Sequence, residues 1–325
     1  MKLVTYEAGK QQRVGVVEGE SVVDVRVVLD LIAKRRVPRA LAGEKQFKQA
    51  AEMLRESGAA PRTMIELLER GAEWRQALHI ITSGLVKHVD AKKAPKGILA
   101  PLASVRLRAP IARPGKITCL GQNYADHARE QGIEPPEKPI YFLKSSNTIS
   151  GPGDPIVLPP NSTQVDYEAE LAVVIGQGGR HIPGEKAYEH VAGYMILQDV
   201  SARDMQFGDK QWYRGKSCDT FAPTGPWIVT PDEIPDPHHL RITLALNGQT
   251  MQDSNTSNLI FKVPFLISYL SQSATWEAGD IISTGTPPGV GVFRKPPVFL
   301  KPGDTVSISI ERIGTLTNPV VGPQK

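Results

Sequence analysis

Short apolar runs separated by glycine and proline fill the chain from Lys116 onward and restrict what it can fold into. Runs such as KITCLG (116–121), AELAVVIG (169–176) and TVSISIERIG (305–314) are short and rich in β-branched residues, which is typical of strands. One longer segment, 258–272, has apolar residues near helical spacing, and Asn247-Gly248 predicts a hairpin turn. We therefore expect this part to be strand-dense, with one or two helices.

The first 110 residues have a different pattern. Residues 1–29 alternate apolar and polar side chains and predict two or three short strands, whereas residues 40–84 are helical in pattern, with Gly71 weakening the middle. For the 325 residues we expect an α+β fold that is predominantly β. A small N-terminal α/β domain (1–110) would precede a larger domain (111–325).

The composition argues against several classes of protein. A hydrophobic content of 40% and a charged content of 22% are ordinary for a soluble globular chain, and no apolar run approaches the roughly 18 residues of a membrane span. The net charge of +4 is mild, without the long basic block of a nucleic-acid-binding arm. Two cysteines, Cys119 and Cys218, argue against a disulfide framework and fit a reducing cytosol, so we expect a cytoplasmic protein.

Glu168, Glu170 and Asp199 are the most informative side chains. Alternation along a predicted buried strand, 165–176, places the two glutamates on one face together with Asp166, and Asp199 ends a second apolar run. Carboxylates that enter a core repel one another and lose hydration, and a divalent cation would cancel that cost. An all-oxygen set suits Mg²⁺, with Mn²⁺ or Ca²⁺ as alternatives. The other interpretation is an edge strand with one face in water, which is commoner for an isolated E-x-E pattern.

A candidate acid–base pair lies in GQNYADHARE (121–130). Asn123 or Asp126 could cap a short helix, on which His127 and Glu130 would share a face. A carboxylate that holds an imidazole fixes its tautomer and raises its basicity, so the pair could activate a water molecule. Alone, this spacing is more often a solvated surface pair.

The segment 199–227 is unusually polar for its place between two apolar runs. Its cations would suit a carboxylate and its aromatic residues would form walls, as in a loop that binds an anionic substrate. Its polar residues include Arg203, Gln206, Lys210 and Lys216. The rigid turn STGTPPGVG (283–291) could present Thr284 or Thr286 to a ligand. An ordinary surface loop or turn is the alternative in both places.

Five motifs in this order resemble the fumarylacetoacetate hydrolase superfamily. They are G-x-N-Y-x-D-H-x-x-E (121–130), D-Y-E-x-E-L-A-V-V-I-G (166–176), D-V-S-A-R-D-x-Q (199–206), G-K-S-x-D-T-F-x-P-x-G-P (215–226) and S-T-G-T-P-P-G-V-G (283–291). The resemblance covers residues 113–325, and 291–304 looks especially like the fumarylacetoacetate hydrolase domain-containing protein 2 branch.

The resemblance implies a mixed β-sandwich roll, usually in a homodimer. It implies Mg²⁺, or else Mn²⁺ or Ca²⁺, held by Glu168, Glu170 and Asp199. It places His127 and Glu130 on a mobile lid as a catalytic, water-activating pair. It also implies a catalytic Lys216, which would hold a substrate carboxylate or a developing oxyanion. The substrate-binding residues that it implies are Arg203, Gln206, Lys210 and Thr286.

The implied substrates are small anionic 2-oxo or β-diketo acids, such as an acylpyruvate or a fumarylacetoacetate-like compound. The first hypothesis is a hydrolase that cleaves a C–C bond through a metal-stabilised enolate. Without attack by water, the same site would give an oxaloacetate decarboxylase. With proton transfer alone it would give an oxaloacetate tautomerase or a 2-hydroxymuconate-type isomerase. A metal-dependent binding protein without turnover is a further class, against which the intact His127–Glu130 pair argues.

Overall fold

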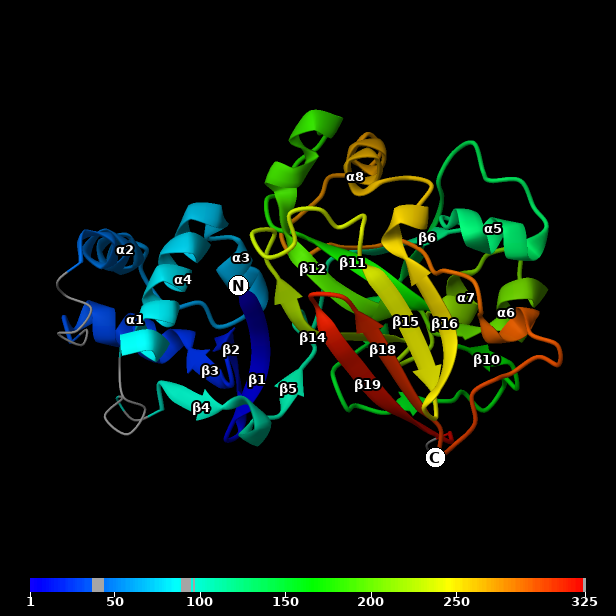
Figure 1. Cartoon of the computed structure of the whole chain (residues 1–325), viewed down its shortest axis with the longest axis horizontal. Helices are drawn as coiled ribbons and strands as arrows, with labels where there is room; N and C mark the ends of the chain where they lie inside the picture. Colours follow the sequence, from blue (N-terminus) through cyan, green and yellow to red (C-terminus); the bar gives the residue numbers. More distant parts are fainter. Residues whose placement is uncertain (37–43, 89–94, 96, 324–325) are drawn as a thin grey trace.

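A computed structural model describes residues 1–36, 44–88, 95 and 97–323. Figure 1 shows a smaller N-terminal part beside a larger, strand-rich part. The N-terminal elements are β1 (Lys2–Ala8), β2 (Gln11–Glu18), β3 (Ser21–Asp24), α1 (Val25–Ala33), α2 (Lys45–Glu56), α3 (Met64–Leu68), α4 (Gly71–His88), β4 (Leu99–Pro101) and β5 (Leu107–Arg108). The predicted strands and the helical stretch are confirmed, although residues 40–43 lie outside the described residues. Gly71 has a φ of +84°, which ends one helical segment and begins the next.

The larger part follows the predicted sequence of strands. Its first half contains β6 (Ile117–Gly121), α5 (Ala125–Gln131), β7 (Ile140–Lys144), β8 (Ile149–Ser150), β9 (Ile156–Val157), β10 (Val165–Asp166), β11 (Ala169–Ile175), β12 (Val191–Gln198) and β13 (Ser201–Ala202). Its second half contains α6 (Arg203–Gly208), α7 (Tyr213–Lys216), β14 (Ala222–Val229), β15 (Arg241–Leu246), β16 (Gln249–Asn255), the 3-10 turn η4 (Thr256–Asn258), α8 (Val263–Ser271), β17 (Ile281–Ser283), β18 (Thr305–Ile310) and β19 (Gly314–Val321).

Two sheets organise these strands. A 12-stranded sheet has the main order β4-β3-β2-β1-β14-β12-β11-β17-β6-β7, and a 5-stranded sheet has the order β16-β15-β18-β19-β9. In Figure 1 the smaller sheet lies across the centre of the larger one. Because β1 pairs with β14, the N-terminal strands extend the main sheet. The proposed division near residue 110 stays a prediction.

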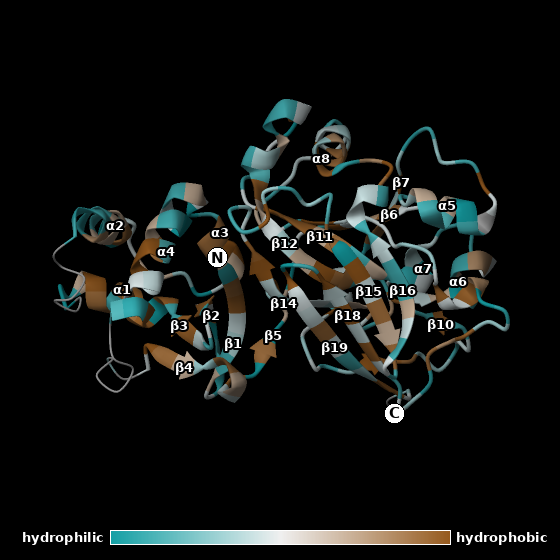
Figure 2. Ribbon diagram, in the orientation of Figure 1, coloured by the Kyte–Doolittle hydropathy of each residue, from teal (hydrophilic) through white to brown (hydrophobic). Residues whose placement is uncertain are grey.

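Strand β11 shows how the layers are held together. Its Leu171 and Val173 belong to the core shared with β15 and β18, whereas Ala172 and Val174 belong to the core shared with α4. This alternation is the one predicted from the sequence. In Figure 2 apolar residues gather on the strands and on α1 and α3, and most connecting loops are hydrophilic. The result is the expected α+β fold, predominantly β, with a sandwich of sheets at its centre.

Two local expectations need correction, and one strand was not recognised from the sequence. The strand predicted over 165–176 is interrupted at Tyr167–Glu168, because β10 pairs with β13 while β11 joins the main sheet. The polar segment 199–227 is not a simple loop but contains α6 and α7. The hairpin at Asn247-Gly248 is confirmed, with φ of 52° and 82°, but its second strand, β16, is too polar to have been recognised from its sequence. Of the helices within the described ranges, none combines the length and the apolar character that crossing a bilayer requires.

Candidate active site

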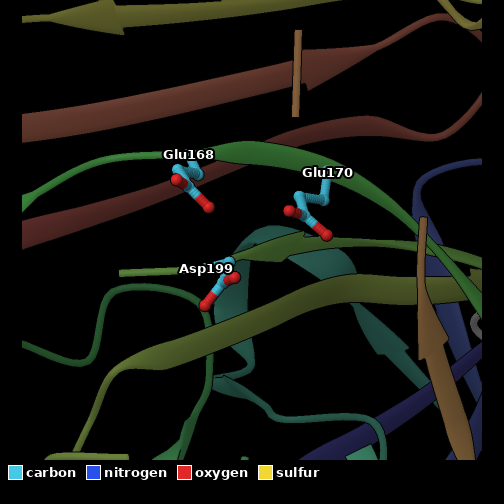
Figure 3. Close-up of side chains that lie close together, drawn as sticks. All are labelled: Glu168, Glu170 and Asp199. Carbon is cyan, nitrogen blue, oxygen red and sulfur yellow. The ribbon is translucent and has the colours of Figure 1, made fainter. Parts of the chain in front are cut away.

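The three predicted carboxylates converge at one place. Glu168 and Glu170 lie on either side of the first residue of β11, and Asp199 directly follows β12, which pairs with β11. Figure 3 shows their carboxyl groups facing one another from these neighbouring segments. One ligand oxygen from each lies within 4.8 Å of the others, and all three residues are buried. The alternative of an edge strand with a wet face is wrong, since β11 lies in the interior of the sheet between β12 and β17.

Basic side chains hold two of the carboxylates. Lys216 Nζ lies 2.8 Å from Glu168 Oε2 and 2.7 Å from Asp199 Oδ2. Arg203 Nη2 donates to Glu168 Oε1 at 2.6 Å. Lys144 Nζ donates to the second oxygen of Asp199, Oδ1, at 2.6 Å. These contacts are buried, so each charge is matched where water cannot screen it.

Glu170 has a different environment. Its Oε2 accepts hydrogen bonds from Ser283 Oγ at 2.5 Å and from the Gly285 backbone N–H at 3.0 Å. Its Oε1 is buried and has no hydrogen-bond partner among the residues that the structure describes. A buried carboxylate oxygen without a partner, facing two further carboxylates, fits a site for a cation that prefers oxygen ligands.

The electrostatics of the cluster agree with this geometry. Burial raises the pKa of the Glu170 carboxyl well above its usual range, and the charges of Asp199 and Glu168 raise it further. Burial also acts to raise the pKa of Glu168, but the charges of Lys216 and Arg203 outweigh it and lower this pKa to about 2. Glu170 is therefore the carboxylate whose charge the protein alone leaves uncompensated, and a divalent cation would compensate it.

The predicted His127–Glu130 pair is formed. Nδ1 of His127 lies 2.9 Å from Glu130 Oε2, and Glu130 Oε1 accepts the backbone N–H of Gly289 at 3.0 Å. His127 is buried and its ring lies 5.9 Å from that of Phe293. The surface-pair alternative is therefore wrong for His127. The predicted side-chain cap is also wrong: Tyr124 is the N-cap of α5, without a side-chain hydrogen bond to the helix.

A cavity of about 80 Å³ is lined by His127 of the pair and by Glu168 of the cluster. Its polar lining residues are Gln122, His127, Glu168, Arg203, Gln206, Lys216 and Thr286, and Phe142, Trp212 and Phe293 form aromatic walls. Lys210 is exposed and is not among the lining residues. A larger cavity, about 720 Å³, lies beside the end of β7 and the residues that follow it, but the described residues that line it include no carboxylate. The small cavity is therefore the candidate active site.

Comparison with known proteins identifies this arrangement. The family described as fumarylacetoacetate (FAA) hydrolase C-terminal matches residues 116–321. The chain belongs to the fumarylacetoacetate hydrolase family. It is accordingly an enzyme of this family, as the resemblance implied.

Relatives within the family match most of the chain. "Oxaloacetate tautomerase FAHD2A, mitochondrial" from Bos taurus is 50% identical over 263 residues, which cover 80% of each chain. The solved fumarylacetoacetate hydrolase from psychrophilic Exiguobacterium antarcticum is 36% identical, with a TM-score of 0.78 and 99% of each chain covered. Maleylpyruvate hydrolase from Sphingobium sp. SYK-6, solved in complex with manganese(II) ion and pyruvate, is 30% identical, with a TM-score of 0.72 over 100% of each chain.

Sequence reasoning missed two charged residues that support the site of this family member. Lys144 ends the apolar strand β7 and contacts Asp199, and no sequence pattern around it indicates this contact. Asp166 was grouped with the glutamates, but it accepts from Arg203 Nε at 2.9 Å and from the Gly291 N–H at 2.7 Å. It therefore fixes the guanidinium that contacts Glu168, and it ties β10 to the loop after β17.

Proposed function

We propose that this protein is a metal-dependent enzyme that interconverts the keto and enol forms of a small 2-oxo dicarboxylic acid, with oxaloacetate as the substrate. The observation that carries the proposal is the buried carboxylate cluster, in which Glu170 Oε1 has no hydrogen-bond partner among the described residues, beside a small cavity that both Glu168 and His127 line. A cavity of about 80 Å³ favours a small acid, since pockets for drug-sized ligands span roughly 300–1,000 Å³. The relative at 50% identity carries the name oxaloacetate tautomerase.

Glu168, Glu170 and Asp199 would hold the cation, for which we propose Mg²⁺, with Mn²⁺ or Ca²⁺ as alternatives. Their oxygens are of the type that all three ions bind. The solved maleylpyruvate hydrolase complex, which contains manganese(II), supports a divalent ion in this family. When bound, the cation would act as a Lewis acid and stabilise negative charge on the substrate oxygens.

His127 would move the proton. Its Nδ1 is engaged with Glu130, so a proton exchanged with the substrate would be carried on Nε2. In the keto-to-enol direction His127 would take a proton from the carbon next to the keto group. The protonated His127 would then return this proton to the keto oxygen. Glu130 would fix the orientation and the tautomer of the ring through its contact with Nδ1.

The remaining polar residues would bind and orient the substrate. Lys216 and Arg203 line the cavity and supply positive charge for a substrate carboxylate. Gln206 accepts from Arg203 Nη1 at 2.9 Å through its oxygen, so its amide N–H₂ would be the donor toward the substrate. Thr286 would contribute its hydroxyl. Lys210, exposed outside the cavity, would act only on a substrate that is entering.

Hydrolysis of a C–C bond in an acylpyruvate is the second candidate. The His127–Glu130 pair favours it, because such a pair can activate water as well as move a substrate proton. The similarity to a solved maleylpyruvate hydrolase also supports hydrolysis. Here His127 would deprotonate a water molecule that attacks the distal carbonyl. Decarboxylation of oxaloacetate would require neither attack by water nor removal of a substrate proton by His127.

We further propose a cytoplasmic homodimer. Ile140, Tyr141 and Leu143 are 39%, 46% and 48% exposed on β7, which ends the main order of the large sheet. Exposed apolar residues along an edge strand are a surface that a second chain can cover. The two cysteines are free, which fits a reducing compartment. Sedimentation of the wild type and of a Leu143→Lys variant would test the dimer, and a monomeric wild type would contradict it.

An ultraviolet assay that follows enol-oxaloacetate tests the reaction. We expect Mg²⁺-dependent conversion to the keto form, lost with EDTA, without formation of pyruvate. His127→Ala should slow conversion by about 100-fold or more, the size of a general acid–base contribution, while Mn²⁺ affinity measured by calorimetry is retained. His181→Ala is the control, since His181 is exposed and contacts Gln272.

Release of an acid from acylpyruvates instead would favour the hydrolase, and formation of pyruvate from oxaloacetate would favour the decarboxylase. Loss of metal in His127→Ala would contradict the proposed role of His127.

A further inference from the structure

Helix α5, which carries His127, is held to the rest of the protein through polar contacts. At its start, Asn123 donates from Nδ2 to the Thr284 carbonyl at 2.8 Å and accepts the Phe261 N–H at 2.8 Å. Later in the helix the residues turn outward, and Arg129 is exposed. Side-chain hydrogen bonds from this seven-residue helix therefore contribute to its orientation over the cavity.

Asp126, which directly precedes His127, connects α5 to distant segments of the chain. Its Oδ2 accepts from Ser254 Oγ at 2.5 Å, on β16, and from Asn258 Nδ2 at 3.0 Å, on η4. Its Oδ1 accepts the backbone N–H of His127 at 3.1 Å. Asn258 Nδ2 also donates to Ser254 Oγ at 3.1 Å, so the two partners are held together. One carboxylate thus connects the backbone of His127 to two residues more than 120 positions away in the sequence.

We propose that Asp126 is a positioning residue that sets the orientation of His127 toward the cavity. The inference rests on the proposed function, because it takes His127 as the group that moves the proton. Glu130 fixes the imidazole ring, whereas Asp126 fixes the helix that carries the ring. Hydrogen bonds to a charged acceptor are stronger than neutral ones, so a single carboxylate is enough to hold a short helix end. A displacement of about 1 Å in an acid–base group can cost on the order of 100-fold in rate.

The test is a mutant cycle on the Mg²⁺-loaded enzyme with enol-oxaloacetate. Asp126→Ala keeps a good helix former in α5 and removes all three contacts. We expect kcat to fall by about 10- to 100-fold, with Mn²⁺ affinity unchanged. The double variant Ser254→Ala/Asn258→Ala should reproduce the loss from the other side of the contact. In a His127→Ala background, Asp126→Ala should cause no further loss, because it acts through His127.

Hydrogen exchange supplies a readout that does not depend on the substrate. The amides of 125–131 should exchange faster in Asp126→Ala. Asp253→Asn should leave them unchanged, because it alters only an exposed ion pair between Asp253 on β16 and Arg241 on β15. Normal kcat in Asp126→Ala beside a slow His127→Ala would overturn the inference alone. An undiminished Asp126→Ala effect in the His127→Ala background would overturn it too. A fully active His127→Ala would overturn the role of His127 and the inference with it.

Discussion

The carboxylate cluster and helix α5 contribute Glu168 and His127 to the same cavity but are built in different ways. Glu170 lies on β11 inside the large sheet, Glu168 directly precedes β11, and Asp199 directly follows the neighbouring strand β12; all three are buried. Helix α5 lies at the edge of the structure in Figure 1 and is fixed to η4 and to the loops after β17 and η4 by side-chain and backbone hydrogen bonds. The proposed metal ligands are therefore more rigidly placed than the proposed proton-moving pair.

This difference separates two tasks that the enzyme must perform. Ligands for a divalent ion work best when their positions are fixed before binding. A histidine that moves a proton must instead admit the substrate and then close on it, which favours a short element held by a few breakable contacts. Variants in the two regions should accordingly affect different measurements.

The largest effect is expected from Glu170→Gln. Glutamine keeps the size of the side chain and can still accept from Ser283, but it removes the charge that faces the other carboxylates. We expect calorimetric Mn²⁺ affinity to fall by more than the roughly 10- to 100-fold typical of residues that only support a ligand, with loss of turnover. Metal-free thermal stability should not fall, since an uncompensated buried charge is removed. Glu277→Gln, at an exposed pair with Lys116, is the control. Unchanged metal affinity in Glu170→Gln would refute the metal site.

A smaller effect is expected from Lys144→Met, which tests how the cluster is held. If Lys144 fixes Asp199, its loss should weaken Mn²⁺ binding by about 10- to 100-fold, and Lys144→Arg should restore part of the affinity. Lys116→Met is a matched control, because Lys116 contacts the buried Asp280 at 2.8 Å, away from the cluster. Tighter metal binding in Lys144→Met would show instead that the lysine acts only as a competing positive charge. Hydrogen exchange of α5 should be unchanged in both variants.

The sequence predicted the carboxylate cluster better than it predicted the contacts of helix α5. Alternation along β11 and the position of Asp199 were enough to predict that three carboxylates meet, because strand geometry fixes where side chains point. It could not predict that Lys144 reaches Asp199, or that Asp166 binds Arg203 instead of joining the cluster, since these contacts depend on how distant segments pack. For α5, the pairing of His127 with Glu130 was predicted because it is local, but the contacts of Asp126 with Ser254 and Asn258 were not. The polar strand β16, which supplies Ser254, was itself unrecognised.

The smallest effect is expected at an ion pair distant from both regions, which gives the baseline for charge changes in this fold. Nδ1 of His79, on α4, lies 3.2 Å from Glu18 Oε1, and this hydrogen bond raises the pKa of His79 above 6.5 although burial opposes it. A raised pKa means that the pair stabilises the folded state fully below the unfolded pKa, and that this contribution is lost as pH rises through the folded pKa. In urea, the free energy of unfolding of the wild type should exceed that of His79→Gln by about 0.5 kcal/mol or less at pH 5.5, because the pair is partly exposed. This difference should be smaller at pH 8.5. Metal affinity should be equal in the two proteins, and a gap that widens with pH would contradict the assigned pair.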